Sequence, residues 1–213
     1  MKHKLNFIDL ELIKIKKINL HRQLQYGKAQ GAYITIKGKK LINLCSNDYL
    51  GIPITKIQTN QLQSSSRLVS GNDELYKKLE NILAKHKSQQ NSLIYPTGYM
   101  ANLGSISAIA KKGDLILSDE LNHASIIEAC KLSDAKIAVY KHNDMNDLAK
   151  KIKIKSKNKF IITEGVFSMD GDLAPLKEIT EISQKINAIT IVDDAHGDFV
   201  IGKEGKGTPE YFK

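Results

Sequence analysis

The chain has 213 residues, 41% of them hydrophobic, which is enough to bury a core and makes one large domain the default expectation. Its formal net charge of +9 invites a nucleic-acid function, but only Arg22 and Arg67 are arginines, and the lysines are spread along the chain. Because direct base readout favours arginine, we expect no nucleic-acid partner. No segment approaches the roughly 20 apolar residues of a membrane span, so we expect a cytoplasmic protein with no membrane partner.

The first 45 residues predict a helix followed by a small β-hairpin, taken together as one N-terminal segment. Two β-rich runs, 33–36 and 40–45, flank a turn at 37–39. Before them, apolar residues recur at the spacing of an amphipathic helix. These residues are Leu5, Ile8, Leu12 and Ile15.

Residues 46–213 predict an α/β domain. A helix is expected at 73–86 and a loop at 202–209, and from about residue 90 short apolar runs alternate with helix candidates. Continuous apolar strands separated by helices indicate a mostly parallel sheet with helices on both faces. The predicted strands are 92–95, 114–118, 136–140, 160–163 and 189–193, and the predicted helices are 99–110, 125–132, 146–152 and 176–186.

Neither of the two cysteines, Cys45 and Cys130, lies in a CxxC motif or a Cys/His cluster. Isolated thiols in a chain of this size are typical of reduced residues in a cytosolic protein, and a single disulfide between them is the alternative. We expect no bound metal.

The motif DDAHG at 193–197 directly follows the last predicted strand. Sheets of this class bind ligands at the carboxyl ends of their strands, so two carboxylates and a histidine fall where a ligand crevice is expected. A buried Asp193 could keep the pyridinium of pyridoxal phosphate charged, and His196 could donate to the phenolic oxygen of its ring. A pair of capping acids with an incidental histidine is the alternative.

A second motif joins the strand predicted at 92–95 to a helix through a turn with one glycine, Gly98. Glycine lets a ligand approach the backbone, and the first amides of a helix have no partner within it, so they suit a phosphate. Ordinary turn and cap chemistry is the alternative.

Two further polar turns follow predicted strands, at 119–125 and 163–172. His123 could stack on a planar cofactor ring, or it could lie half exposed beside a helix capped by Asn122. Ser168 could hydrogen-bond near the phenolic oxygen; its acidic, glycine-rich turn also resembles a Ca²⁺ loop, but the EF-hand spacing is absent. Because four polar groups at the ends of successive strands rarely coincide by chance, we interpret them as one active site.

Together these motifs resemble the α-oxoamine synthase family of fold-type-I pyridoxal-phosphate enzymes, in the family's own order along the chain. The matching segments are CSNDYLG (45–51), SGNDELYKKLE (70–80), TGYMAN (97–102), LNHASIIEA (121–129), TEGVFSMDGDLAPL (163–176) and DDAHG (193–197).

The resemblance implies an aspartate-aminotransferase-like fold, with residues 46–213 as the large domain that binds pyridoxal 5'-phosphate. It places Gly98 and Tyr99 at the phosphate. It stacks His123 on the cofactor ring and packs Ala195 on the opposite face.

Four further positions take their roles from the resemblance. Ser168 and His196 would contact the phenolic oxygen, and Asp193 would face the pyridine nitrogen. Asn47 would lie near the substrate or the partner subunit's site, in a homodimer. His123 would also be catalytic, orienting the ring and the acyl carbonyl.

Within the family, DDAHG is most similar to the branch that condenses L-alanine with a pimeloyl thioester in biotin synthesis, releasing CO₂ and the thiol carrier. Two alternatives stay open. One is the same chemistry with glycine and acetyl-CoA, and the other is a non-catalytic subunit of a split enzyme. A nicotinamide enzyme is disfavoured, because no GxGxxG follows the first strand.

The chain departs from the family pattern at several positions. Phe199 stands where the family has a glycine, and Tyr76 replaces a common histidine. The arginine expected to bind substrate carboxylate would fall on Gln23, next to Arg22.

The lysine that binds the cofactor covalently has no counterpart in the expected sequence context. Lys203, Lys206 and Lys213 lie close after DDAHG without the family's lysine motif. We therefore expect the C-terminal small domain to be absent and the chain by itself to be catalytically silent, because that amine is also the base for the α-proton.

Overall fold

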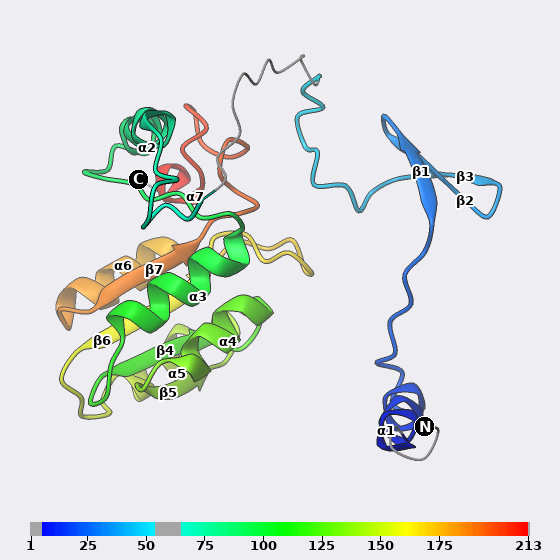
Figure 1. The fold of residues 1–213 in the computed structure, drawn as a ribbon. Helices are drawn as coiled ribbons and strands as arrows, with labels where there is room; N and C mark the ends of the chain where they lie inside the picture. The colour runs from blue at the N-terminus through cyan, green and yellow to red at the C-terminus, as the bar shows by residue number, and fades with distance from the viewer. Residues whose placement is uncertain (1–5, 54–64, 213) are drawn as a thin grey trace. The chain divides into compact units, whose positions relative to one another are not determined.

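Figure 1 shows the fold in a computed structural model, which describes residues 6–53 and 65–212. The two stretches belong to two separate compact units. Within the described stretches, no helix combines the length and apolar character needed to cross a membrane.

The first unit contains a helix and a three-stranded antiparallel meander. Lys37 and Gly38 both have positive φ, 48° and 76°, and form the two-residue turn whose twist suits a hairpin. The predicted hairpin is confirmed, but its last strand ends before residue 45, because the Asn43 side chain accepts the Cys45 N–H and turns the chain. The elements are α1 (Asn6–Lys17), β1 (Gly27–Gln30), β2 (Tyr33–Ile36) and β3 (Lys39–Ile42).

The second unit is built on a parallel sheet in the order β5-β4-β6-β7 (Figure 1). This confirms the predicted α/β architecture. Its strands are β4 (Leu115–Asp119), β5 (Lys136–Tyr140), β6 (Lys159–Glu164) and β7 (Ile189–Asp193). Its helices are α2 (Glu74–His86), α3 (Gly98–Ile109), α4 (Ala124–Leu132), α5 (Met145–Lys151), α6 (Leu176–Lys185) and the single turn α7 (Thr208–Tyr211), which lies where only a loop was predicted.

The alternation of side chains along β4 and β6 divides the core between the two faces of the sheet. Ile116 and Ile162 point toward α3 and α4, and Leu117 and Ile161 point toward α5 and α6. All four are fully buried, which explains why β4 and β6 contain consecutive apolar residues rather than one at every second position.

The strand predicted at 92–95 is wrong. The backbone of this stretch bonds to side chains instead of to a neighbouring strand: the Ile94 N–H donates to Glu80 Oε1 at 3.0 Å, and its carbonyl accepts from Arg67 Nη1 at 2.9 Å. Arg67 and Glu80 also form an ion pair at 2.8 Å. An apolar run alone does not reveal that its hydrogen bonds go elsewhere.

The Glu80–Arg67 pair generates a stability prediction. The Ile94 amide and Arg67 together hold the pKa of Glu80 below its ordinary value of 4.5. Since the folded pKa is depressed, this stabilisation is present above pH 4.5 and is lost as the pH falls through the folded value. Glu80→Gln should therefore lower the urea midpoint at neutral pH, with a gap to wild type that narrows on acidification. The control is Glu128→Gln, which removes an exposed pair with Lys131 and should change little. Equal midpoints for both variants would contradict the assignment.

Candidate functional site

The carboxyl ends of β4, β6 and β7 lie along one edge of the sheet, and each is followed by a loop that carries predicted site residues. The parallel register pairs the last residue of β6, Glu164, with the last residue of β7, Asp193. The start of α3 is tied to the same edge, because the Asn102 side chain bonds to both β7 and α4. The structure thus gathers the three loops and a helix N-terminus around one place.

Asp193 is half-buried, and both of its carboxylate oxygens accept hydrogen bonds. Asn102 Nδ2 donates to Oδ2 at 2.7 Å, and the Ala195 N–H donates to Oδ1 at 3.1 Å. These two bonds fix the plane of the carboxylate. A fixed carboxylate in this position can face a cationic nitrogen without having to reorganise.

Glu164 is a residue of the site to which the sequence analysis assigned no role, although it lies inside a quoted motif. It is 4% exposed. Burial raises the pKa of Glu164, opposed by hydrogen bonds from the His123 and Ser168 backbones and reinforced by the nearby charge of Asp193. One buried carboxyl group therefore joins the loops after β4 and β6. An acid at the last position of an apolar strand is the signal that could have identified it.

His123 is the N-terminal cap of α4, and its exposed ring lies at the surface of the site. Its Nδ1 accepts the Ser125 N–H at 3.2 Å and lies 2.7 Å from Ser125 Oγ. The ring of Tyr99 meets it edge-on, with centroids 6.4 Å apart. The capping alternative for Asn122 is wrong, because the Asn122 side chain is buried and donates to Ser118 Oγ and the Ile162 carbonyl.

The first turn of α3 has the features of an anion site. Thr97 caps the helix by accepting the Met100 N–H at 3.1 Å. Nothing lies within 4 Å of the position that a Cβ on Gly98 would occupy, so the backbone there is open to approach. The other first-turn amides have no partner within the helix, and they suit a phosphate group.

The remaining predicted residues are placed as follows. Ala195 and Ser168 are exposed, in the loops after β7 and β6, and His196, directly after Ala195, is half-buried. Asn47 lies in the first unit, where Tyr49 donates to its side-chain oxygen. The contacts of these four residues with cofactor or substrate stay predictions.

A second carboxylate of DDAHG, Asp194, organises the loop after β7. It accepts the Thr208 N–H and hydroxyl at 3.0 and 2.6 Å, and Lys87 lies 3.6 Å away. A Cβ on Gly165, Gly197 or Gly207 would overlap this carboxylate. Burial raises the pKa of Asp194 against the effect of these partners. The alternative of a capping acid fits Asp194, which holds the start of α7.

Phe199 takes the left-handed conformation that a glycine adopts freely, with φ of 59°. Its ring stacks on His86 at 4.7 Å, and its N–H donates to the Gly205 carbonyl. Phe199 is therefore a bulky residue in a backbone conformation that glycine adopts freely, and its ring contact with His86 offsets the strain.

His142 connects three loops at the same edge of the sheet. Its Nδ1 lies 2.9 Å from Asp119 and its Nε2 lies 2.8 Å from Asp172, whose side chain also accepts from Asn143. The ring meets Phe167 edge-on. This arrangement anchors the loop that contains Ser168 to the ends of β4 and β5.

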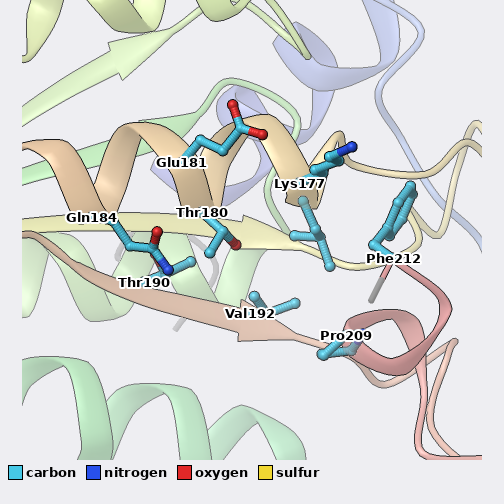
Figure 2. A pocket seen from close by; sticks show the side chains of 9 residues that line it. Lys177, Thr180, Glu181, Gln184, Thr190, Val192, Pro209 and Phe212 are labelled. Carbon is cyan, nitrogen blue, oxygen red and sulfur yellow. The ribbon is translucent and has the colours of Figure 1, made fainter.

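Figure 2 shows a groove formed by α6, β7 and α7. Thr180 and Gln184 come from α6, Val192 from β7, and Pro209 and Phe212 from the α7 region. None of the predicted site residues lines this groove, so the candidate site is the strand-end edge described above.

The family model for aminotransferase class I and II matches residues 39–210, and the chain belongs to this family. A relative from Thermoanaerobacter pseudethanolicus, named 8-amino-7-oxononanoate synthase, is 42% identical over 99% of this chain. Serine palmitoyltransferase from Sphingomonas wittichii has a similar structure, with a TM-score of 0.84 and 30% identity over 98% of the chain. A further solved structure, described as SPT with PLP internal aldimine, gives a TM-score of 0.82 at 28% identity over the same share.

These findings confirm the resemblance to the α-oxoamine synthases and the fold-type-I assignment. The chain spans 57% of the 8-amino-7-oxononanoate synthase and 56% of each of the two solved structures. It therefore corresponds to about half the length of the proteins that it matches.

The residues of the site fit pyridoxal phosphate, the cofactor of this family. Asp193 is an anchored carboxylate that could face a pyridine nitrogen, and the open first turn of α3 suits a phosphate. The exposed ring of His123 is available for a planar partner. These three features are thus complementary to the pyridine nitrogen, the phosphate and the planar ring of the cofactor.

The contacts of His142 with Asp119 and Asp172, here called the His142 clamp, predict that stability depends on pH. Burial lowers the pKa of His142, but hydrogen bonds and charge from Asp119 and Asp172 outweigh it, so the net shift is upward from 6.5. The stabilisation is fully present below the pKa of His142 in the unfolded state, and it is lost as the pH rises through the pKa of His142 in the folded state. We expect the gap in thermal midpoint between wild type and His142→Gln to be largest near about pH 6 and to shrink in alkali. His21→Gln, in the first unit, is the control. A gap that grows with pH would contradict the clamp.

Proposed function

We propose that this chain forms the cofactor-binding part of a pyridoxal-phosphate-dependent acyltransferase that condenses L-alanine with a pimeloyl thioester in biotin synthesis. The observation that carries the proposal is the Asn102-anchored Asp193 beside the His123 loop and the open start of α3. The 42% identity to a protein named 8-amino-7-oxononanoate synthase supports the substrate pair.

Bound pyridoxal phosphate would supply an electron sink for the negative charge that develops on the substrate carbon. Asp193 would hold a proton at the pyridine nitrogen, which strengthens that sink. The first turn of α3 would bind the phosphate, and His123 would cover one face of the ring and orient the acyl carbonyl. Ser168 and His196 would donate to the phenolic oxygen, and Ala195 would pack on the opposite face.

Several finer expectations belong to the same proposal. A homodimer in the cytoplasm, with Asn47 near the substrate or the partner subunit's site, stays a prediction, as does the catalytic silence of the 213 residues alone. A non-catalytic role within a split enzyme is the alternative of a different class. It would show as cofactor binding without turnover unless a second chain is added.

Asp193→Asn, made in the enzyme completed with the cofactor-binding lysine, is the first test. The amide keeps the shape but cannot hold a proton at the pyridine nitrogen, so we expect turnover to fall by about a hundredfold or more, with an unchanged thermal midpoint. Asp134→Asn makes the same change in charge just before β5, at the amino end of the sheet, and should leave turnover unaffected. Turnover of Asp193→Asn at the level of this control would remove Asp193 from its role.

A comparison of substrate pairs is the second test. Initial rates of the completed enzyme would be measured with L-alanine and pimeloyl-CoA, and with glycine and acetyl-CoA. We expect a kcat/KM at least tenfold higher for the alanine pair, because a relative that is 42% identical is named 8-amino-7-oxononanoate synthase. A preference for glycine would overturn the biotin assignment while leaving the cofactor assignment intact.

A further inference from the structure

A continuous chain of hydrogen bonds runs beneath the candidate site, and we propose that Asn102 and Ser125 are positioning residues within it. They would fix the carboxylate of Asp193 and the tautomer of His123 together, as one unit. The inference rests on the proposed function, because it concerns two groups assigned to opposite parts of the cofactor.

The chain of bonds joins three elements. Asn102 on α3 donates from Nδ2 to Asp193 Oδ2, at the end of β7, at 2.7 Å. The same nitrogen lies 2.9 Å from Ser125 Oγ, on α4, which in turn lies 2.7 Å from His123 Nδ1. Ser125 is 1% exposed, so its hydroxyl has to satisfy its hydrogen bonds inside the protein.

The protons of this chain can be assigned from the chemistry of its ends. A carboxylate only accepts, so the Asn102 atom that faces Asp193 must be the amide nitrogen. Its second proton goes to Ser125 Oγ. Ser125 therefore accepts from Asn102 and has its single hydroxyl proton left for His123 Nδ1.

The assignment fixes the neutral His123 ring in one tautomer. Nδ1 accepts from the Ser125 hydroxyl and also from the Ser125 N–H, so the proton of the neutral ring lies on Nε2. The charge of Asp193 thus sets the direction of the side-chain bonds as far as the Ser125 hydroxyl, which acts on His123 Nδ1 beside the Ser125 N–H. A change at Asn102 should be felt at Asp193, and also at His123 where it redirects the Ser125 hydroxyl proton.

Three substitutions distinguish effects on Asp193 from effects on His123, at the two ends of the chain of hydrogen bonds. Asn102→Ala removes the bond to Asp193 but leaves the Ser125 hydroxyl free to donate to His123. Ser125→Ala removes that donor and keeps the contact with Asp193. Asn102→Asp replaces the donor by an acceptor, which repels Asp193 and draws the Ser125 proton away from His123.

The matched control is Asn158→Ala. Asn158 donates from Nδ2 to Asp114 Oδ1 at 2.8 Å, just before β4, so the variant loses the same type of Asn–Asp bond at the amino end of the sheet.

The first readout is the histidine tautomer, observed by ¹⁵N NMR of the cofactor-free protein that carries this chain. We expect wild type, Asn102→Ala and Asn158→Ala to show His123 in the Nε2–H form at alkaline pH. Ser125→Ala and Asn102→Asp should show a measurable fraction of the Nδ1–H form. Identical spectra in all five proteins would overturn the inference.

The second readout is the dissociation constant of pyridoxal 5'-phosphate, from titration of the cofactor absorbance. Asn102→Ala and Asn102→Asp should weaken binding about tenfold or more, since a hydrogen bond to a charged group is lost. Asn158→Ala should bind like wild type. If wild type binds the cofactor and the Asn102 variants have the same dissociation constant as Asn158→Ala, the inference is overturned and the proposed function stands. If wild type does not bind the cofactor, the proposed function itself is overturned.

Discussion

The site depends on two carboxyl groups, Glu164 and Asp193, that the parallel register of β6 and β7 places side by side at the ends of their strands. Neither can be left unpartnered next to the other. Glu164 is buried and takes backbone hydrogen bonds from the loops of His123 and Ser168, and Asp193 takes its partners from Asn102 and Ala195. Satisfying these two acids draws the helix start and all three loops to one edge of the sheet.

Much of the second unit could be predicted because its two central strands, β4 and β6, are buried on both faces. Their apolar runs have no solvent face to alternate toward, and their short length excludes helices. The same pattern misled at 92–95, where Arg67 and Glu80 supply the hydrogen bonds that a neighbouring strand would give. These hydrogen-bond partners are set by the tertiary structure, so a local sequence pattern cannot predict them. The strand β1 was missed for the opposite reason: GKAQ has no β-branched or aromatic residue.

The candidate site was predictable where a motif follows a strand, because parallel strands bring their carboxyl ends together. Asp193 and His123 follow their strands at that edge as expected, whereas Gly98 follows no strand, and its helix α3 is tied to the edge by Asn102. The supporting residues were not predicted: Asn102 sits in the middle of a helical pattern, and Glu164 ends an apolar run. The partners of Asn102, which are Ser125 and Asp193, lie more than twenty residues away. Glu164 takes its hydrogen bonds from the backbones of His123 and Ser168, in two different loops. The family resemblance identifies Phe199 as a departure, but it does not predict that Phe199 adopts the left-handed backbone conformation that a glycine adopts freely.

In the proposed function, the anchored Asp193 carboxylate would face the pyridine nitrogen of pyridoxal phosphate. ¹⁵N NMR of cofactor labelled at that nitrogen, bound to the protein that carries this chain, tests this contact most directly. We expect the chemical shift of a protonated pyridinium at neutral pH, retained well above the pH at which free cofactor loses that proton. The shift of an unprotonated pyridine at neutral pH would contradict it.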